Sequence, residues 1–185
     1  MSQIYAFLAE GFEEVECLAV VDLLRRAKLQ VSLISITGEK AVTGSHHITV
    51  LADALFEKTD LSNADLLFLP GGVPGTPNLA AHKGLTDALK NHAANGKRLA
   101  AICAAPSILG GLNILKNKKA TCYPGWEDKL TDAIYQPKGV VTDGTITTAK
   151  GLGFAIDLGL ELISLLLDKE TSEKIKSGIQ YNDEK

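Results

Sequence analysis

The chain has 185 residues, of which 45% are hydrophobic and 22% are charged, and its formal net charge is -3. This balance is typical of a soluble globular protein, and it argues against nucleic acid as a partner, because no basic surface is expected that would neutralise phosphates. The first residues are acidic rather than basic, unlike those of a secretory signal, and the longest apolar run, 158–167, is too short to span a bilayer. Three cysteines without metal-type spacing predict free thiols in a reducing compartment, so we expect a cytoplasmic protein with no membrane partner.

Predicted strands and helices alternate along the chain. Short apolar runs predict buried strands at 4–9, 30–36, 65–69 and 99–102. Helical patterns predict helices at 13–27, 84–95, 106–112 and 153–167. Turn residues between β-forming residues predict a hairpin or an edge excursion at 41–51 and a hairpin at 140–148. The tail, 171–185, holds a short amphipathic stretch that then frays. This alternation predicts one α/β domain over residues 1–185, with a central, mainly parallel sheet covered by helices on both faces.

Cys103 stands where a predicted strand runs into a predicted helix. Ala101 and Ala105 lie two residues before and after it, matching the small residues that a nucleophile elbow needs where strand and helix backbones meet. Pro106 suits the first helical turn, where its missing N–H costs nothing. A thiol at a helix N-terminus is expected to have a lowered pKa and to favour thiolate. The alternative is a buried structural cysteine, and this segment by itself leaves both interpretations open.

Two further groups are expected beside Cys103, because the carboxyl ends of neighbouring parallel strands open onto one crevice. Gly71 and Gly72 end a buried strand, and their N–H groups together with that of Ala104 are candidates for an oxyanion hole, although a plain turn explains the glycines equally well. Glu16 follows the first strand and falls among the apolar residues at 15, 18 and 19. If it faces the crevice, burial and a neighbouring thiolate would raise its pKa and let it act as an acid or base.

The remaining polar candidates have simpler explanations. His82 and His92 are expected on the surface of a helix, and Cys17 and Trp126 in the packing of the protein. Cys122 is a candidate for a second redox thiol that lines the Cys103 crevice. The hairpin histidines, His46 and His47, are candidates for contacts with a second subunit.

Several motifs together give the chain a family resemblance that covers nearly its whole length. It resembles the ThiJ/PfpI superfamily, in the branch of the Parkinson-disease protein deglycase and its bacterial relatives, through LAEGFEEVE (8–16), VDLLRRA (21–27), LPGG (69–72), NL (78–79) and AAICAAP (100–106). The resemblance implies a flavodoxin-like sandwich and a homodimer. It also implies that Cys103 is the reactive cysteine, Glu16 its carboxyl partner, Gly72 and Ala104 its backbone donors, and Arg25 or Arg26 an interface residue.

Two positions depart from the pattern of this family. A segment that often reads T-x-H-P is here Thr121-Cys122-Tyr123-Pro124, so Tyr123 takes the place of a histidine and becomes a candidate for lining the site, beside Gly71 and Cys122. His46 stands where animal relatives have an arginine, which marks it as a possible interface residue. Without the histidine, a cysteine–histidine protease dyad is not expected.

The resemblance implies an enzyme that acts on small reactive dicarbonyls or glycated adducts, as a glutathione-independent glyoxalase or protein deglycase. Cys103 would be its nucleophile and Glu16 its proton shuttle, with no metal, nucleotide or other cofactor. The alternative is an oxidative-stress sensor or redox-regulated chaperone that works through oxidation of Cys103. A cysteine peptidase or amidase is a third interpretation, and it lacks the base that would protonate a leaving amine.

Overall fold

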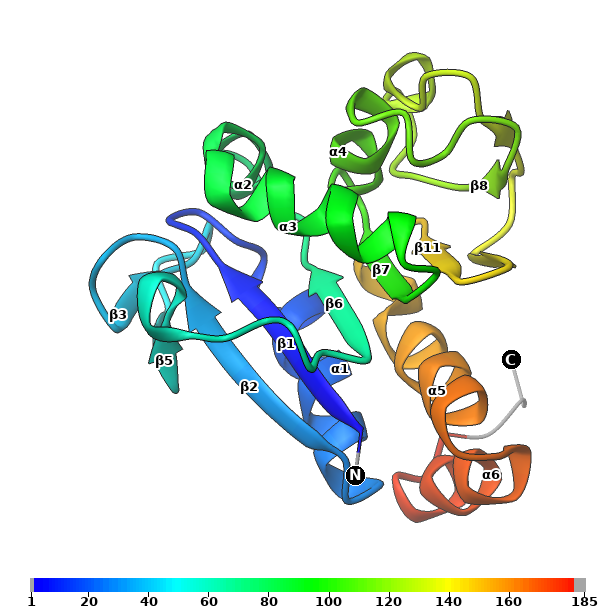
Figure 1. Cartoon of the computed structure of the whole chain (residues 1–185). Coiled ribbons are helices and arrows are strands. Elements are labelled where there is room, and N and C mark those ends of the chain that lie inside the picture. The colour runs from blue at the N-terminus through cyan, green and yellow to red at the C-terminus, as the bar shows by residue number, and fades with distance from the viewer. Residues whose placement is uncertain (1, 182–185) are drawn as a thin grey trace.

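The computed structural model describes residues 2–181, and its centre is a seven-stranded sheet (Figure 1). The strand order is β10-β11-β7-β6-β1-β2-β5, and every neighbouring pair is parallel except β10 with β11. The strands are β1 (Gln3–Leu8), β2 (Gln30–Ser35), β5 (Ala54–Leu55), β6 (Leu66–Leu69), β7 (Arg98–Ile102), β10 (Val140–Asp143) and β11 (Ile146–Ala149). The mainly parallel sheet predicted from the apolar runs is confirmed.

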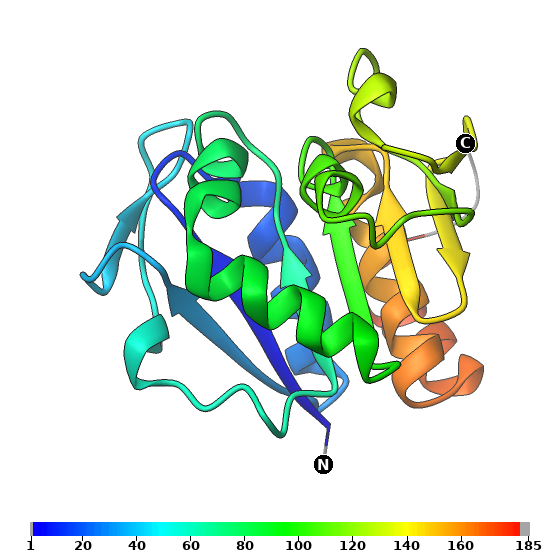
Figure 2. The same ribbon diagram turned by 45° about the horizontal axis from the view of Figure 1, so that its top comes forward.

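Helices cover both faces of this sheet, as Figure 2 shows. One face carries α1 (Glu14–Arg26) and α5 (Ala155–Leu166), whose buried side chains form one apolar cluster with the strands. The other face carries α2 (Gly75–Ala81), α3 (Lys83–Ala94) and α4 (Pro106–Gly111), which contribute to a second cluster. The last helix, α6 (Lys169–Gly178), packs on α5. The result is the predicted three-layer α/β sandwich of flavodoxin type.

Both predicted hairpins are present, and several short elements escaped prediction. One hairpin is β3 (Ala41–Thr43) with β4 (Thr49–Leu51), and the other is β10 with β11. The unpredicted pieces are α2, β5, β8 (Lys119–Ala120), β9 (Ile134–Tyr135), and the 3-10 turns η1 (Phe56–Lys58), η2 (Glu127–Lys129) and η3 (Leu152–Phe154). All of these except α2 have only two or three residues, which is too short to show a periodicity. The predicted fraying of the tail lies at 182–185, outside the described residues.

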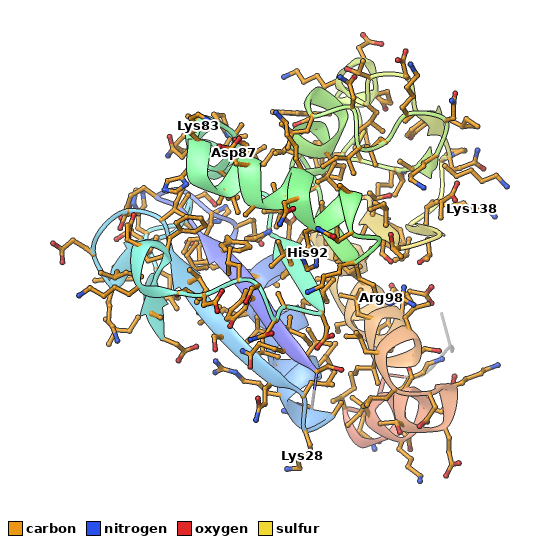
Figure 3. The ribbon with its side chains drawn as sticks, viewed as in Figure 1. Lys28, Lys83, Asp87, His92, Arg98 and Lys138 are labelled. Carbon is orange, nitrogen blue, oxygen red and sulfur yellow. The ribbon has the colours of Figure 1, made fainter. Side chains whose placement is uncertain are left out.

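Two sequence-based assignments of exposure were wrong. Glu16 was grouped with the apolar residues at 15, 18 and 19, but Val15 is 49% exposed, and the buried apolar face of α1 is formed by Cys17, Val20, Leu23 and Leu24. His92, expected to be solvated, is only 5% exposed on α3 (Figure 3). It falls seven residues after Leu85 and therefore lies on the buried stripe of that helix. Burial is the main reason that the pKa of His92 is lowered.

The chain order of the strands changes direction beside β1. The chain leaves β1 toward β2 on one side, and it leaves the neighbouring β6 toward β7 on the other side, so the connections from these two strands run in opposite directions. In open α/β sheets, the loops at the carboxyl ends of two such strands separate and leave a crevice. The loops that follow β1, β6 and β7 meet at this end of the sheet. Among the described residues, no helix is long and apolar enough to cross a membrane.

Candidate active site

Cys103 lies on a sharp turn between β7 and α4, with a backbone φ of +64°. This left-handed conformation is uncommon for a residue with a side chain and is typical of functional sites. The Cys103 N–H donates to the carbonyl of Ala149 at 2.9 Å, and its carbonyl accepts from the N–H of Tyr123 at 2.8 Å. The side chain is partly exposed, whereas Cys17 and Cys122 are both fully buried. The structure therefore has the predicted nucleophile elbow, and it presents one of the three thiols.

Glu16 lies directly against Cys103. The first turn of α1 carries its side chain into the crevice, where it is only 1% exposed and hydrogen-bonds the sulfur. The N–H of Gly71 donates to Glu16 Oε2 at 3.1 Å, and the N–H of Leu152 also donates to the carboxyl group. Two backbone donors thus orient a carboxyl group toward a thiol.

Burial controls the protonation of this pair. Desolvation raises the pKa of Glu16 to about 7, with a smaller contribution from the charge of Glu13, while the hydrogen bonds from Cys103, Gly71 and Leu152 act in the opposite direction. Desolvation likewise raises the pKa of Cys103 to about 12, and the charge and hydrogen bond of Glu16 add to this effect. The pair therefore loses its first proton near neutral pH, from Glu16.

The predicted lowering of the pKa of Cys103 was wrong. The N–H groups of Ala104 and Gly72 do reach the sulfur and favour thiolate, as the predicted donors should. Their effect is smaller than that of burial beside a carboxylate. The resting state above neutral pH is consequently a thiol beside the Glu16 carboxylate, which is placed to remove the thiol proton during attack.

The loop after β11 also contributes to the site, which the sequence analysis missed. The Leu152 N–H binds Glu16, and a Cβ on Gly151 would lie 4.0 Å from Glu16 Oε1 and 3.3 Å from the Tyr123 ring. Gly151 and Gly153, which directly follow a strand, could have predicted this contribution. The carboxyl ends of neighbouring parallel strands open onto the same crevice.

The residues predicted to line the site lie in different places. Gly71 contacts Glu16, and a Cβ on Gly71 would overlap both the carboxyl group and Cys103. Tyr123 lies beside Gly151 and is 50% exposed. Cys122 packs inside the second apolar cluster, whereas Cys103 packs against the first, and burial raises the pKa of Cys122 to about 11. As predicted, Cys17 lies in the core.

The predicted interface residues all have partners within the chain. Arg25 pairs with Asp53 at 2.7 Å, and Arg26 pairs with Asp22 at 2.6 Å. His46 is exposed and contacts Glu14. The homodimer that the resemblance implies stays a prediction.

Comparison with known proteins agrees with this fold. The model of the DJ-1/PfpI family matches residues 2–165. Protein dj-1beta of Drosophila melanogaster is 31% identical over 179 residues, which are 95% of this chain and 96% of the relative. Two Arabidopsis thaliana relatives are longer, and the chain spans less than half of each. DJ-1 homolog B is 33% identical over 91% of this chain and 39% of the relative. DJ-1 homolog A is 36% identical over 92% of this chain and 44% of the relative.

Two solved structures are especially similar. A mutant of a DJ-1 superfamily protein from Salmonella typhimurium superposes with a TM-score of 0.95, at 31% identity over 98% of this chain and 100% of the other. Toxoplasma gondii DJ-1, solved in an oxidized form, superposes with a TM-score of 0.94, at 32% identity over 98% of this chain and 99% of the other. This is an α/β protein with a cysteine on a nucleophile elbow and a carboxyl partner. The chain belongs to the DJ-1/PfpI family.

Proposed function

We propose that the protein is a cofactor-independent enzyme that converts small reactive dicarbonyls to hydroxy acids in the cytoplasm. The observation that carries this proposal is the hydrogen bond between the buried Glu16 carboxyl group and the Cys103 sulfur, beside the N–H groups of Gly72 and Ala104. A relative named glutathione-independent glyoxalase DJR-1.2, from Caenorhabditis elegans, supports it at 28% identity over 168 residues.

With methylglyoxal as substrate, the first step forms a carbon–sulfur bond. The Glu16 carboxylate removes the Cys103 proton as the sulfur attacks the aldehyde carbon. Negative charge moves onto the aldehyde oxygen, where the N–H groups of Gly72 and Ala104 are placed to stabilise it. Glu16 returns the proton to this oxygen, and the product is a hemithioacetal with Glu16 again ionised.

The second step moves a hydrogen between the two carbons. Glu16 removes the proton from the former aldehyde carbon and delivers it to the neighbouring carbon, while the hydroxyl proton passes from the oxygen of the first carbon to that of the second. The first carbon is thereby oxidised and the second reduced without any external electron carrier. The resulting lactoyl thioester is cleaved by one water molecule, which releases lactate and restores the thiol. The same nucleophile would release early glycation adducts from amines or thiols.

Cys103→Ser tests this proposal. We expect lactate to form from methylglyoxal without glutathione in the wild type, and turnover to fall at least about 100-fold in the variant, because serine is a far weaker nucleophile at neutral pH. Cys122→Ser is the matched control, since its thiol is buried in the core, and it should keep the wild-type rate. Lactate formation that survives Cys103→Ser would exclude Cys103 as the nucleophile.

A second candidate function is oxidation sensing, and the exposure of Cys103 favours it. Among the three cysteines, only this one is accessible, and a protonated Glu16 is placed to donate a hydrogen bond to an oxidised sulfur. Mild peroxide should therefore add two oxygens selectively to Cys103, as intact-mass and peptide mass spectrometry would show. Equal oxidation of all three cysteines would count against a sensor.

A further inference from the structure

Both polar groups of the Cys103 backbone are held by other parts of the chain. Its N–H donates to the carbonyl of Ala149 at 2.9 Å, and its carbonyl accepts from the N–H of Tyr123 at 2.8 Å. The φ of Cys103, +64°, is one that a residue with a side chain keeps only where its surroundings fix it. These two hydrogen bonds are therefore part of what holds the turn that presents the sulfur.

The loop that supplies the Tyr123 N–H is anchored where it begins. The N–H of Thr121, the first residue after β8, donates to Thr148 Oγ1 at 2.9 Å. Only Cys122 stands between Thr121 and Tyr123, and its side chain is packed in the second apolar cluster. The hydroxyl of Thr148 thus fixes the chain two residues before the N–H that holds the turn.

Burial makes the hydrogen bond between Thr121 and Thr148 hard to replace. The two residues are 0% and 1% exposed, so water does not reach the bond. The Thr121 hydroxyl has no hydrogen-bond partner among the described residues, so the backbone N–H is the group that ties this residue to Thr148. A buried N–H without an acceptor is costly, and the loop would have to move to satisfy it.

Thr148 belongs to the strand that also holds the rest of the site. β11 lies parallel beside β7, the strand that ends at the Cys103 turn (Figure 1). The next residue of β11, Ala149, supplies the carbonyl that accepts from the Cys103 N–H. The loop after β11 supplies the Leu152 N–H that donates to Glu16. A hydroxyl on this strand therefore places the neighbouring loop relative to both the thiol and the carboxyl group.

We propose that Thr148 is a positioning residue for Cys103, acting through the N–H groups of Thr121 and Tyr123. Its hydroxyl keeps the turn in the conformation that holds the sulfur against Glu16. Thr148 neither contacts substrate nor carries a proton, and it acts only through the backbone. The effect on turnover rests on the function proposed above, whereas the effect on the sulfur can be measured without it.

Thr148→Val tests the hydroxyl, because valine has nearly the same shape as threonine but cannot accept a hydrogen bond. We expect kcat for lactate formation from methylglyoxal to fall at least about 10-fold, since a small displacement of the nucleophile is enough to cost that much. The KM should change less than about threefold, because Thr148 does not contact substrate. Thr148→Ser keeps the oxygen and loses a buried methyl group, so its kcat should stay within about threefold of the wild-type value although its stability falls.

A second measurement follows the Cys103 thiol itself and needs no turnover. The rate of alkylation by iodoacetamide at pH 8 is measured by peptide mass spectrometry. Glu16 raises the pKa of Cys103 more than the backbone N–H groups lower it, so loss of this arrangement should increase the thiolate fraction. Cys103 should therefore react at least about threefold faster in Thr148→Val than in the wild type, and at the wild-type rate in Thr148→Ser.

Thr147→Val is the matched control. Thr147 is the neighbouring residue of β11 and is equally buried, and its hydroxyl hydrogen-bonds that of Thr142 at 3.1 Å rather than the loop. This variant should keep the wild-type kcat and alkylation rate. A wild-type alkylation rate in Thr148→Val would overturn the proposal whether or not lactate forms, and so would a Thr148→Ser protein that reacts as fast as Thr148→Val. Faster alkylation in Thr148→Val alone would support the positioning role even if the wild type formed no lactate.

Discussion

Glu16→Gln is expected to abolish turnover and stabilise the fold at the same time. Glutamine is close to glutamate in size and keeps a carbonyl oxygen for the N–H groups of Gly71 and Leu152, but it cannot remove a proton from Cys103 or carry one between carbons. Loss of a positioned acid–base group costs about 100- to 10,000-fold in rate. Lactate formation should fall by this amount, and the wild-type rate should rise with pH as Glu16 ionises near pH 7.

The effect on stability has the opposite sign. The pKa of Glu16 rises from 4.5 to about 7 in the folded protein, so the folded state binds the proton more tightly than the unfolded state does. The folded protein therefore loses stability as pH increases between these values, by about 3 kcal/mol in total. Glutamine does not ionise, so the variant should not show this loss and should be more stable than the wild type at pH 8.

Denaturant unfolding at pH 5 and pH 8, together with lactate assays, checks both expectations. Glu57→Gln is the control, because Glu57 is exposed and lies far along the chain from the site. It should change neither rate nor stability beyond experimental scatter. A Glu16→Gln enzyme with full turnover would remove Glu16 from the mechanism, and an unchanged pH dependence of unfolding would mean that its carboxyl group titrates normally.

Gly71→Ala is expected to disrupt the site without a change in any charged or nucleophilic group. A methyl group at this position would overlap Glu16 Oε2 and Cys103 Cβ and would lie 3.1 Å from the carbonyl oxygen of Ile102. The carboxyl group and the thiol must move apart to admit it. Because a displacement of about 1 Å can cost about 100-fold in rate, we expect lactate formation to fall at least that far.

The stability of Gly71→Ala should also fall, by about 1–3 kcal/mol, since an extra carbon in a tightly packed region forces its neighbours to shift. Gly111→Ala is the matched control, because no atom outside its chain neighbours and the backbone of α4 lies within 4 Å of a Cβ placed on Gly111. That variant should keep wild-type turnover and stability. Wild-type lactate formation by Gly71→Ala would show that the contact between Glu16 and Cys103 is not needed for catalysis.

The sequence by itself determined the layers of this protein and the position of Cys103 on a turn between a strand and a helix. The evidence for both was local. It consisted of apolar runs of strand length, helical patterns between them, and small residues around Cys103, and local sterics and hydrophobicity are sufficient to predict strands, helices and a sharp turn from these patterns. The resemblance to the ThiJ/PfpI superfamily added Glu16 as the partner of that cysteine, and the fold places the two in contact.

Only the tertiary structure decided the protonation of the site and its outer parts. The pKa of Cys103 is raised by burial and by Glu16, a residue that only the folded chain brings beside it. This increase outweighs the lowering of the pKa by the backbone N–H groups at the turn. The Leu152 N–H reaches Glu16 because β11 ends at the same crevice.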